Sequence, residues 1–330
     1  MFTFSELTPI LTALGDQGYG TLQIVAAPEL AGQYYPHCDP GRPMLLIGPA
    51  DGAALGRMAL ALVQVYPSDH PLTVIAGATQ ETMALAGLAE RGQLAAGEAL
   101  WIPPLPAAAA YADLQDVIAH LRAPEGCPWD RELTWDKLRA SLLEESHELL
   151  AALDMGDAGK VAEELGDLLL QIGMQTQIAA EEGRFRLPDV IAGIVGKLVR
   201  RHPHVFGDAE VSGTAEVLAN WEAIKRQERQ GNGGSPTGAS PLSGVPVGLP
   251  ALAQADAYLE RMSRLRAAPA PVAPWAILAD AAADEATPDK VGDALFELVA
   301  WTRARGVDAE SALRAANARF AAQVAAEEEN

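Results

Sequence analysis

The pattern of apolar and polar residues changes about a third of the way along the 330-residue chain. Before residue 112, short apolar and β-branched runs alternate with turn-forming residues, a pattern that predicts strands. Strands are expected within the ranges 21–27, 44–50, 71–78 and 99–105. Between the second and third runs, residues 52–66 show helical periodicity. The first 112 residues therefore predict an α/β lobe.

From residue 113 to residue 230 the apolar positions recur at helical spacing, which predicts an all-helical region. Asp157 is expected to cap one of these helices, and Pro188 to lie in the first turn of another. A segment rich in Gly, Ser and Pro follows at 231–246 and predicts a linker. Residues 247–330 predict a second helical region. A chain of this length is expected to form more than one domain, here with boundaries at 1–112, 113–230, 231–246 and 247–330.

Two pairs of acidic residues are the most informative feature of the helical region. Glu145 and Glu148 are three residues apart, and Glu164 and Asp167 repeat that spacing sixteen residues later. Residues three apart share a helix face, so two facing helices would bring four carboxylates together. Glu145 falls within the apolar stripe of its helix, where a charged side chain is unfavourable unless it is paired or binds a metal. The pattern therefore favours a metal site over a solvated acidic face.

The residue types also indicate which metal would bind. Carboxylates without a nearby thiolate suit Mg²⁺, with Mn²⁺ as the alternative, whereas a di-iron site in a helical bundle would use Glu-x-x-His pairs. Because Mg²⁺ often shares its coordination shell with substrate phosphates, cations that bind phosphate are expected nearby. The candidates, with one aromatic residue, are Lys160, Lys197, Arg201, Trp221 and Lys225. Considered alone, each of these cations could simply stabilise the end of a helix by interacting with its dipole, and Trp221 could be a core residue.

Five segments in order resemble the MazG family of nucleoside triphosphate pyrophosphohydrolases. They are GCPWDRELTWDKLR (126–139), LLEESHELLAAL (142–153), EELGDLLLQ (163–171), KLVRRHPHVFGD (197–208) and WEAIKRQE (221–228). The resemblance implies all-α helical bundle repeats and the conversion of a nucleoside triphosphate to a monophosphate and pyrophosphate. It also implies that magnesium is held by Glu145, Glu148, Glu164 and Asp167. The same resemblance assigns the polyphosphate to Lys160, Lys197, Arg201 and Lys225, and the nucleotide pocket to Trp221.

The residues are consistent with hydrolysis at the α-phosphorus. A bound metal lowers the pKa of water, and a carboxylate that is not fully used in coordination, Glu145 or Glu148, can take the proton. Lys and Arg side chains can stabilise the leaving pyrophosphate. No Ser-His-Asp or Cys-His arrangement indicates a covalent intermediate. His202 and His204 are interpreted as capping or structural residues, because Pro203 marks a helix end.

Residues 247–330 resemble a second, degenerate MazG repeat. DKVGDALFELVAW is similar to EELGDLLLQIGMQ, but Lys290 stands at the position of Glu164, and only Asp293 remains of that acidic pair. A lysine at this position would repel Mg²⁺. The second repeat is therefore expected to have a structural or packing role.

Parts of the N-terminal lobe, RPMLLIG and YPSDHPLTVIAGA, resemble the second lobe of tetrapyrrole methylases. The other lobe of such an enzyme, with its glycine-rich cofactor loop, has no counterpart in this sequence. No methyl transfer is therefore expected. A structural or dimerising role is favoured for residues 1–112.

Composition limits the partners and the compartment. A formal charge of −20 argues against binding to nucleic acid, and only Cys38 and Cys127 are present, as in a reducing compartment. Neither a signal peptide nor a membrane-spanning run is expected, so a cytoplasmic location is predicted. Small helices lined by carboxylates generally need a partner to complete a core, which favours a homodimer. Two alternatives stay open: a nucleotide-sensing or scaffold protein without turnover, and a metal-free helical interaction protein.

Overall fold

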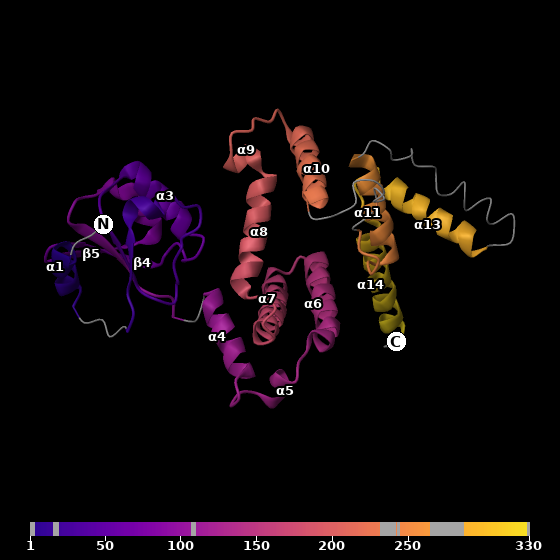
Figure 1. The fold of residues 1–330 in the computed structure, drawn as a ribbon, viewed down its shortest axis with the longest axis horizontal. Helices are drawn as coiled ribbons and strands as arrows, with labels where there is room; N and C mark the ends of the chain where they lie inside the picture. Colours follow the sequence, from indigo (N-terminus) through magenta and orange to yellow (C-terminus); the bar gives the residue numbers. More distant parts are fainter. Residues whose placement is uncertain are drawn as a thin grey trace. The chain divides into compact units, whose positions relative to one another are not determined.

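The computed structural model describes residues 4–15, 20–106, 110–231, 242, 245–264 and 287–328 (Figure 1). The chain divides into two compact units. The first comprises Met1–Leu138 and Leu169–Glu181, and the second comprises Arg139–Leu168 and Glu182–Asn330. Two long helices, α6 (Trp135–Met155) and α7 (Ala158–Glu181), contribute residues to both units.

A mixed five-stranded sheet forms the centre of the N-terminal lobe, as predicted for an α/β fold. Its strands lie in the order β1-β2-β7-β4-β5; β1 and β2 are parallel, and the other pairs are antiparallel. The bounds are β1 (Gln23–Ala26), β2 (Met44–Ile47), β4 (Pro71–Ala76), β5 (Thr79–Ala84) and β7 (Glu98–Ile102). Each of the four predicted runs overlaps one strand of this sheet, although β7 begins one residue earlier than predicted. The fifth, β5, was not predicted, because TQETMA is mostly polar; it lies at an edge of the sheet, largely exposed.

Alternating residues of the strands build two cores, one on each face of the sheet. Met44 and Leu46 of β2 enter one core, and Leu45 and Ile47 enter the other. The first core is covered by α2 (Ala27–Leu30), α3 (Gly52–Leu62) and the 3₁₀ helix η1 (Leu85–Arg91). Helix α1 (Phe4–Leu14) supplies Ile10 to the second core, on the other side of the strands (Figure 1). A two-stranded sheet, β3 (Ala50–Asp51) with β6 (Gln93–Leu94), completes the lobe.

The predicted helix at 52–66 is shorter than expected. Helix α3 ends at Leu62, and the following residues form a turn in which Tyr66 N–H donates to the carbonyl of Leu62. Asp51 caps its first turn by accepting a hydrogen bond from Ala54 N–H at 2.8 Å. The helix is thus bounded by local polar contacts that its apolar period alone does not reveal.

Residues 113–230 are helical, as the periodicity predicted. Besides α6 and α7, the region contains α4 (Tyr111–Arg122), α5 (Pro128–Arg131), α8 (Leu187–Arg201), α9 (Pro203–Phe206) and α10 (Thr214–Gly231). Ile118 of α4 packs with Met174 and Ile178 of α7 in a small core. A Cβ at Gly173 would collide with the Ile118 side chain, so α4 and α7 approach closely at this glycine. Arg122 adds an ion pair with Glu181 at 2.7 Å.

The connection between α6 and α7 is a two-residue turn that makes the helices antiparallel neighbours (Figure 1). Gly156 adopts a φ of 70°, a left-handed conformation that glycine reaches without a steric penalty at the end of a helix. Asp157 then accepts hydrogen bonds from Gly159 N–H and Lys160 N–H, at 3.0 and 3.1 Å. The predicted N-cap at Asp157 is confirmed. Pro188 lies in the first turn of α8, also as predicted.

The C-terminal region contains α11 (Ala251–Arg264), α13 (Pro288–Arg303) and α14 (Ala309–Glu328). Leu259 of α11 and Val299 of α13 share a core, and Arg303 pairs with Asp256 at 2.8 Å. Most of the predicted linker, and the segment that precedes Pro288, lie outside the described residues. The second repeat stays a prediction. No helix among the described residues combines the length and the apolarity that crossing a bilayer requires.

Candidate metal and phosphate site

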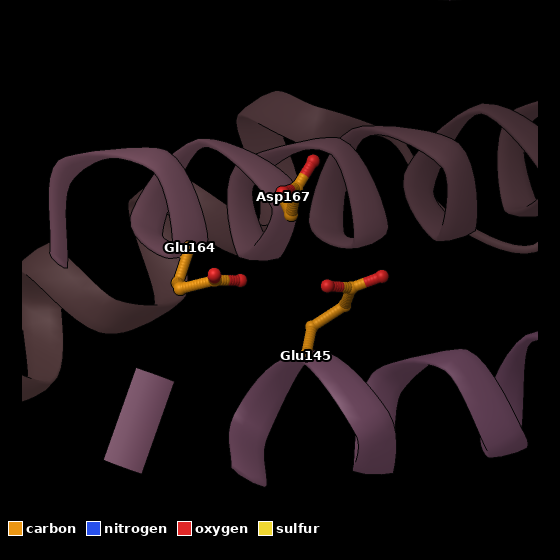
Figure 2. Close-up of side chains that lie close together, drawn as sticks. All are labelled: Glu145, Glu164 and Asp167. Atoms are coloured by element: carbon orange, nitrogen blue, oxygen red, sulfur yellow. The ribbon is translucent and has the colours of Figure 1, made fainter. Parts of the chain in front are cut away.

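Three of the four predicted acids lie together between α6 and α7. Glu145 projects from α6, and the carboxylate of Glu164 extends from α7 into the same space, with Asp167 one turn further along α7 (Figure 2). One carboxylate oxygen from each lies within 4.8 Å of the others. Glu164 is buried, with 7% of its surface exposed, and the other two are half-buried.

The pKa values of Glu145 and Glu164 are raised, first by desolvation and then by the charges of neighbouring acids. For Glu145, desolvation is the main cause, followed by the charges of Asp167 and Glu148. Desolvation is also the main cause of the raised pKa of Glu164, with Glu148 again contributing. The charge of Lys160 acts in the opposite direction on Glu164. Without a cation between them, the ionised carboxylates therefore repel each other.

Glu148 takes a different position from the other predicted ligands. Its side chain is exposed, and it is not part of the three-acid group, although its charge acts on Glu145 and Glu164. The apolar stripe expected around Glu145 is only partly buried: Leu138 is buried, whereas Leu142 and Leu153 are 37% and 54% exposed. On α6, Glu145 is thus half-buried beside α7, whereas Leu142 and Leu153 of the same stripe are exposed.

The three-acid group has the chemistry of a site for a hard divalent cation. Oxygen ligands from two helices suit Mg²⁺ or Mn²⁺, and a cation would relieve the repulsion between the carboxylates. Gln171, one turn after Asp167, is buried, and its Oε1 accepts no hydrogen bond from the residues that the structure describes. A buried acceptor of this kind on the same helix is a further oxygen that an ion or its water shell could satisfy. The residues therefore fit a bound metal.

The predicted phosphate-binding residues fall into two places. Lys160 lies one turn before Glu164 on α7, with its Nζ 3.5 Å from Glu163. Arg201 and Lys225 gather around the indole ring of Trp221, at 5.2 and 4.4 Å from the ring centroid. Lys197 is exposed on α8, one turn before Arg201. Helices α8 and α10 thus bring three of the five predicted residues into contact.

Two side chains of the site were not identified as functional from the sequence. Glu228 pairs with both Arg200 and Arg201. Its place at the end of the segment WEAIKRQE was a signal, but its partners lie 27 and 28 residues earlier and could not be assigned without the fold. Gln171 lies one helical turn after Asp167, and its residue type alone gave no functional signal. His202 holds the Leu198 carbonyl at 2.7 Å through Nδ1, in agreement with a capping role.

The family model described as "MazG nucleotide pyrophosphohydrolase domain" matches residues 133–206. This range includes all four acids. The chain is 38% identical over 227 residues to the nucleoside triphosphate pyrophosphohydrolase of Escherichia coli (strain K12); the match covers 63% of this chain and 82% of that enzyme. It is 37% identical over 225 residues to the Thermotoga maritima nucleoside triphosphate pyrophosphohydrolase/pyrophosphatase MazG, with 64% and 82% covered.

A third relative is longer. The uncharacterized protein YabN of Bacillus subtilis (strain 168) is 38% identical over 214 residues, and the match covers 62% of this chain and 43% of YabN. The resemblance of the N-terminal lobe to a methylase stays a prediction, because the matched domain begins at residue 133. Identity of 38% across most of the Escherichia coli enzyme, together with the domain match over the acidic helices, shows that this chain belongs to the MazG family of nucleoside triphosphate pyrophosphohydrolases, which are hydrolases acting on phosphoric anhydrides.

Proposed function

We propose that this protein hydrolyses nucleoside triphosphates at the α-phosphorus, giving a nucleoside monophosphate and pyrophosphate. The observation that carries the proposal is the convergence of Glu145, Glu164 and Asp167 from two helices, within the segment that matches the MazG domain. The names of the relatives from Escherichia coli and Thermotoga maritima support the same activity.

We propose that Mg²⁺, with Mn²⁺ as the alternative, is the cofactor, held by Glu145, Glu164 and Asp167 with Glu148 beside them. When bound, such an ion supplies positive charge to the substrate phosphates and lowers the pKa of water. The raised pKa of Glu145 and of Glu164 supports the proposal, because repulsion among uncompensated carboxylates is what a cation would remove.

The chain's own residues then share the remaining chemistry. Glu148, which is exposed and outside the three-acid group, is the carboxylate that we assign to take a proton from the attacking water, with Glu145 as the alternative. The water oxygen forms a bond to the α-phosphorus, and the bond from that phosphorus to the bridging oxygen breaks. Pyrophosphate leaves with the electron pair of the broken bond. Its developing charge is stabilised by the four predicted cations, Lys160, Lys197, Arg201 and Lys225, with Trp221 lining the nucleotide pocket.

A product-resolved assay in ¹⁸O-labelled water tests the reaction. The purified full chain, each nucleoside triphosphate and MgCl₂ are expected to yield monophosphate that carries the label, with unlabelled pyrophosphate. Diphosphate with labelled orthophosphate would contradict attack at the α-phosphorus. The panel should include damaged triphosphates, since clearing the nucleotide pool in the cytoplasm is the proposed role.

A nucleotide sensor or scaffold without turnover is the alternative function. One observation favours it: Arg201 and Lys225 are held by Glu228 and Trp221 on α8 and α10, so this cationic group is built without the acids of α6 and α7. Nucleotide binding without product, unchanged by Glu164→Gln, would identify a sensor.

We also propose a homodimer in which the second copy covers the outer faces of α6, α7 and α8. Helix α8 contributes no buried residue, and six of its seven large aliphatic residues are between 40% and 50% exposed: Val190, Ile191, Ile194, Val195, Leu198 and Val199. Leu165, Leu169 and Ile172 on α7 are similarly exposed. So much exposed apolar surface on each of these helices is typical of an interface. No nucleic acid partner is proposed, because the chain carries a charge of −20.

The roles of the predicted domains follow from this assignment. We propose that residues 113–230 are the catalytic domain, that 1–112 form a structural or dimerising lobe, and that 247–330 form a packing repeat beyond the linker at 231–246. Lys290 lies in the first turn of α13, with Asp293 three residues later on the same helix. A lysine there replaces the acid that the catalytic repeat has at Glu164. Lys290→Ala is therefore expected to change turnover by less than about twofold.

A further inference from the structure

One carboxylate joins two arginines across helices α8 and α10. Glu228 Oε1 accepts from Arg200 Nε and Nη2 at 3.0 and 2.8 Å. Its Oε2 accepts from Arg201 Nε and Nη2 at 3.0 and 2.6 Å. The two pairs differ in exposure: the side chain of Arg200 is 59% exposed, whereas those of Arg201 and Glu228 are 16% and 17% exposed. The pair with Arg201 is therefore the inner one, and it is less screened by solvent.

The geometry of the inner pair leaves most of the donors of Arg201 directed elsewhere. A guanidinium has five N–H groups in a fixed plane, and Glu228 takes one from Nε and one from Nη2. Three N–H groups remain on the other edges of the same plane. Because the fork is rigid, holding one edge fixes the direction of the others. Glu228 therefore orients Arg201 without using up its capacity to bind a phosphate.

The same arrangement extends to the aromatic ring and the lysine. Arg201 and Lys225 both lie against Trp221, and Lys225 Nζ is also 4.0 Å from Glu222. Along α10, Lys225 and Glu228 are three residues apart and Trp221 is one turn before Lys225, so all three share a helix face. Because Arg201 and Lys225 lie over the same Trp221 ring, fixing Arg201 on α8 also fixes the position of α8 relative to Trp221 and Lys225.

We propose that Glu228 is a positioning residue: it holds Arg201, and through the Trp221 ring Lys225, in the arrangement that binds the polyphosphate of the substrate. This inference rests on the proposed function. Glu228 itself does not contact the substrate, since two anions would repel each other. The two arginines lower its pKa, with the hydrogen bonds from Arg201 as the largest cause, so the carboxylate remains ionised at neutral pH. Its place in the segment WEAIKRQE does not reveal this role, because the role depends on contacts with α8.

Glu228→Gln tests the role of the charge while keeping the shape of the side chain. In the labelled-water assay, KM for the Mg²⁺ nucleotide should rise about tenfold with kcat within about twofold, because weaker charge-assisted hydrogen bonds loosen substrate binding and leave the acids intact. Asp256→Asn is the matched control: it removes the carboxylate partner of Arg303 between α11 and α13, and both constants should stay within about twofold. A lowered KM in Glu228→Gln would mean that Glu228 competes with phosphate, and would overturn the proposal.

A double-mutant cycle separates positioning from general destabilisation. If Glu228 acts through Arg201, Glu228→Gln should add less than about twofold to KM in an Arg201→Lys background. A full tenfold increase in that background would overturn the proposal. If circular dichroism shows that Glu228→Gln does not fold, Glu228→Asp replaces it, because aspartate keeps the charge on a shorter side chain. The change in KM is then compared in the same double-mutant cycle, with the same twofold limit.

Binding of inorganic tripolyphosphate, measured by calorimetry without turnover, distinguishes failure of this inference from failure of the proposed function. The wild-type chain should bind it about tenfold more tightly than Glu228→Gln. If the wild type does not hydrolyse nucleotides but this difference is found, the proposed reaction is wrong and the role of Glu228 stands. Equal affinities in a wild type that hydrolyses nucleotides would overturn the role of Glu228 alone.

Discussion

The N-terminal lobe and helices α6 to α8 place their apolar and charged side chains in opposite ways. In the lobe, Leu45 and Leu46 are fully buried on the two faces of a sheet, and the acids lie outside. On α7, Glu164 is buried while Leu165 beside it is 47% exposed. The lobe encloses its own core in one copy of the chain. The helices have an interior suited to a cation and an exterior suited to a partner, so their stability is expected to depend on ligands.

The largest expected effect is on catalysis. Glu164→Gln should lower kcat/KM for the Mg²⁺ nucleotide at least about a hundredfold, because Glu164 is the buried member of the three-acid group. Glu144→Gln, an exposed neighbour on α6, is the control and should remain within about twofold of wild type. Similar activity in both variants would mean that the buried Glu164 matters no more for catalysis than the exposed Glu144.

The second effect concerns the two kinds of leucine. Leu45→Ala should lower the free energy of unfolding by about 2–5 kcal/mol, because it opens a cavity in a closed core. Leu165→Ala should cost less than about 1 kcal/mol at concentrations where the chain is monomeric. Denaturant titrations at several protein concentrations measure both. An equally large loss for Leu165→Ala at the lowest concentration would show that its face is already covered within one chain.

The third effect concerns the proposed partner. Ile191→Glu on α8 places a charge on the exposed apolar face and should raise the dimer dissociation constant at least about tenfold, measured by analytical ultracentrifugation. Val247→Glu is the control, because this 89% exposed valine lies outside both the N-terminal lobe and helices α6 to α8, and it should leave the dissociation constant unchanged. A wild-type chain that is monomeric at high concentration would contradict the homodimer.

The smallest effect is on the stability of the metal-free protein as pH varies. The folded-state pKa of Glu145 is raised, so the native state binds more protons, and this carboxyl lowers stability as pH rises from its ordinary pKa through the raised one. Glu145→Gln should therefore raise Tm in EDTA at pH 7 and lose that advantage at pH 4. An unchanged or lowered Tm at pH 7 would mean that the acids do not repel each other.

The sequence predicted those parts of the fold that depend on local patterns. Alternation and helical period located the strands and the helices, and Asp157 and Pro188 predicted helix starts correctly. The polar edge strand β5 was missed, because its pairing with β4 and not its composition makes it a strand. The exposure of Leu142 and Leu153 was also not foreseen, since a helical period shows that residues share a face but not what covers that face.

The candidate site was predictable as a set of residue types and not as an arrangement. Spacing on two helices indicated the acids, but the separate position of Glu148 appears only once α6 and α7 are placed together. The link from Glu228 to Arg201 joins residues 27 apart on different helices, a contact that no periodicity encodes. Tertiary contacts therefore decide which of several similar acids bind a cation and which orient an arginine.

The most direct test of the central claim is a Mn²⁺ titration of the nucleotide-free protein, in which electron paramagnetic resonance measures the free ion. The account predicts saturable binding by the wild type, lost in Glu164→Gln and in Asp167→Asn, and unchanged in the surface variant Glu144→Gln. Equal Mn²⁺ affinity in wild type and Glu164→Gln would contradict it.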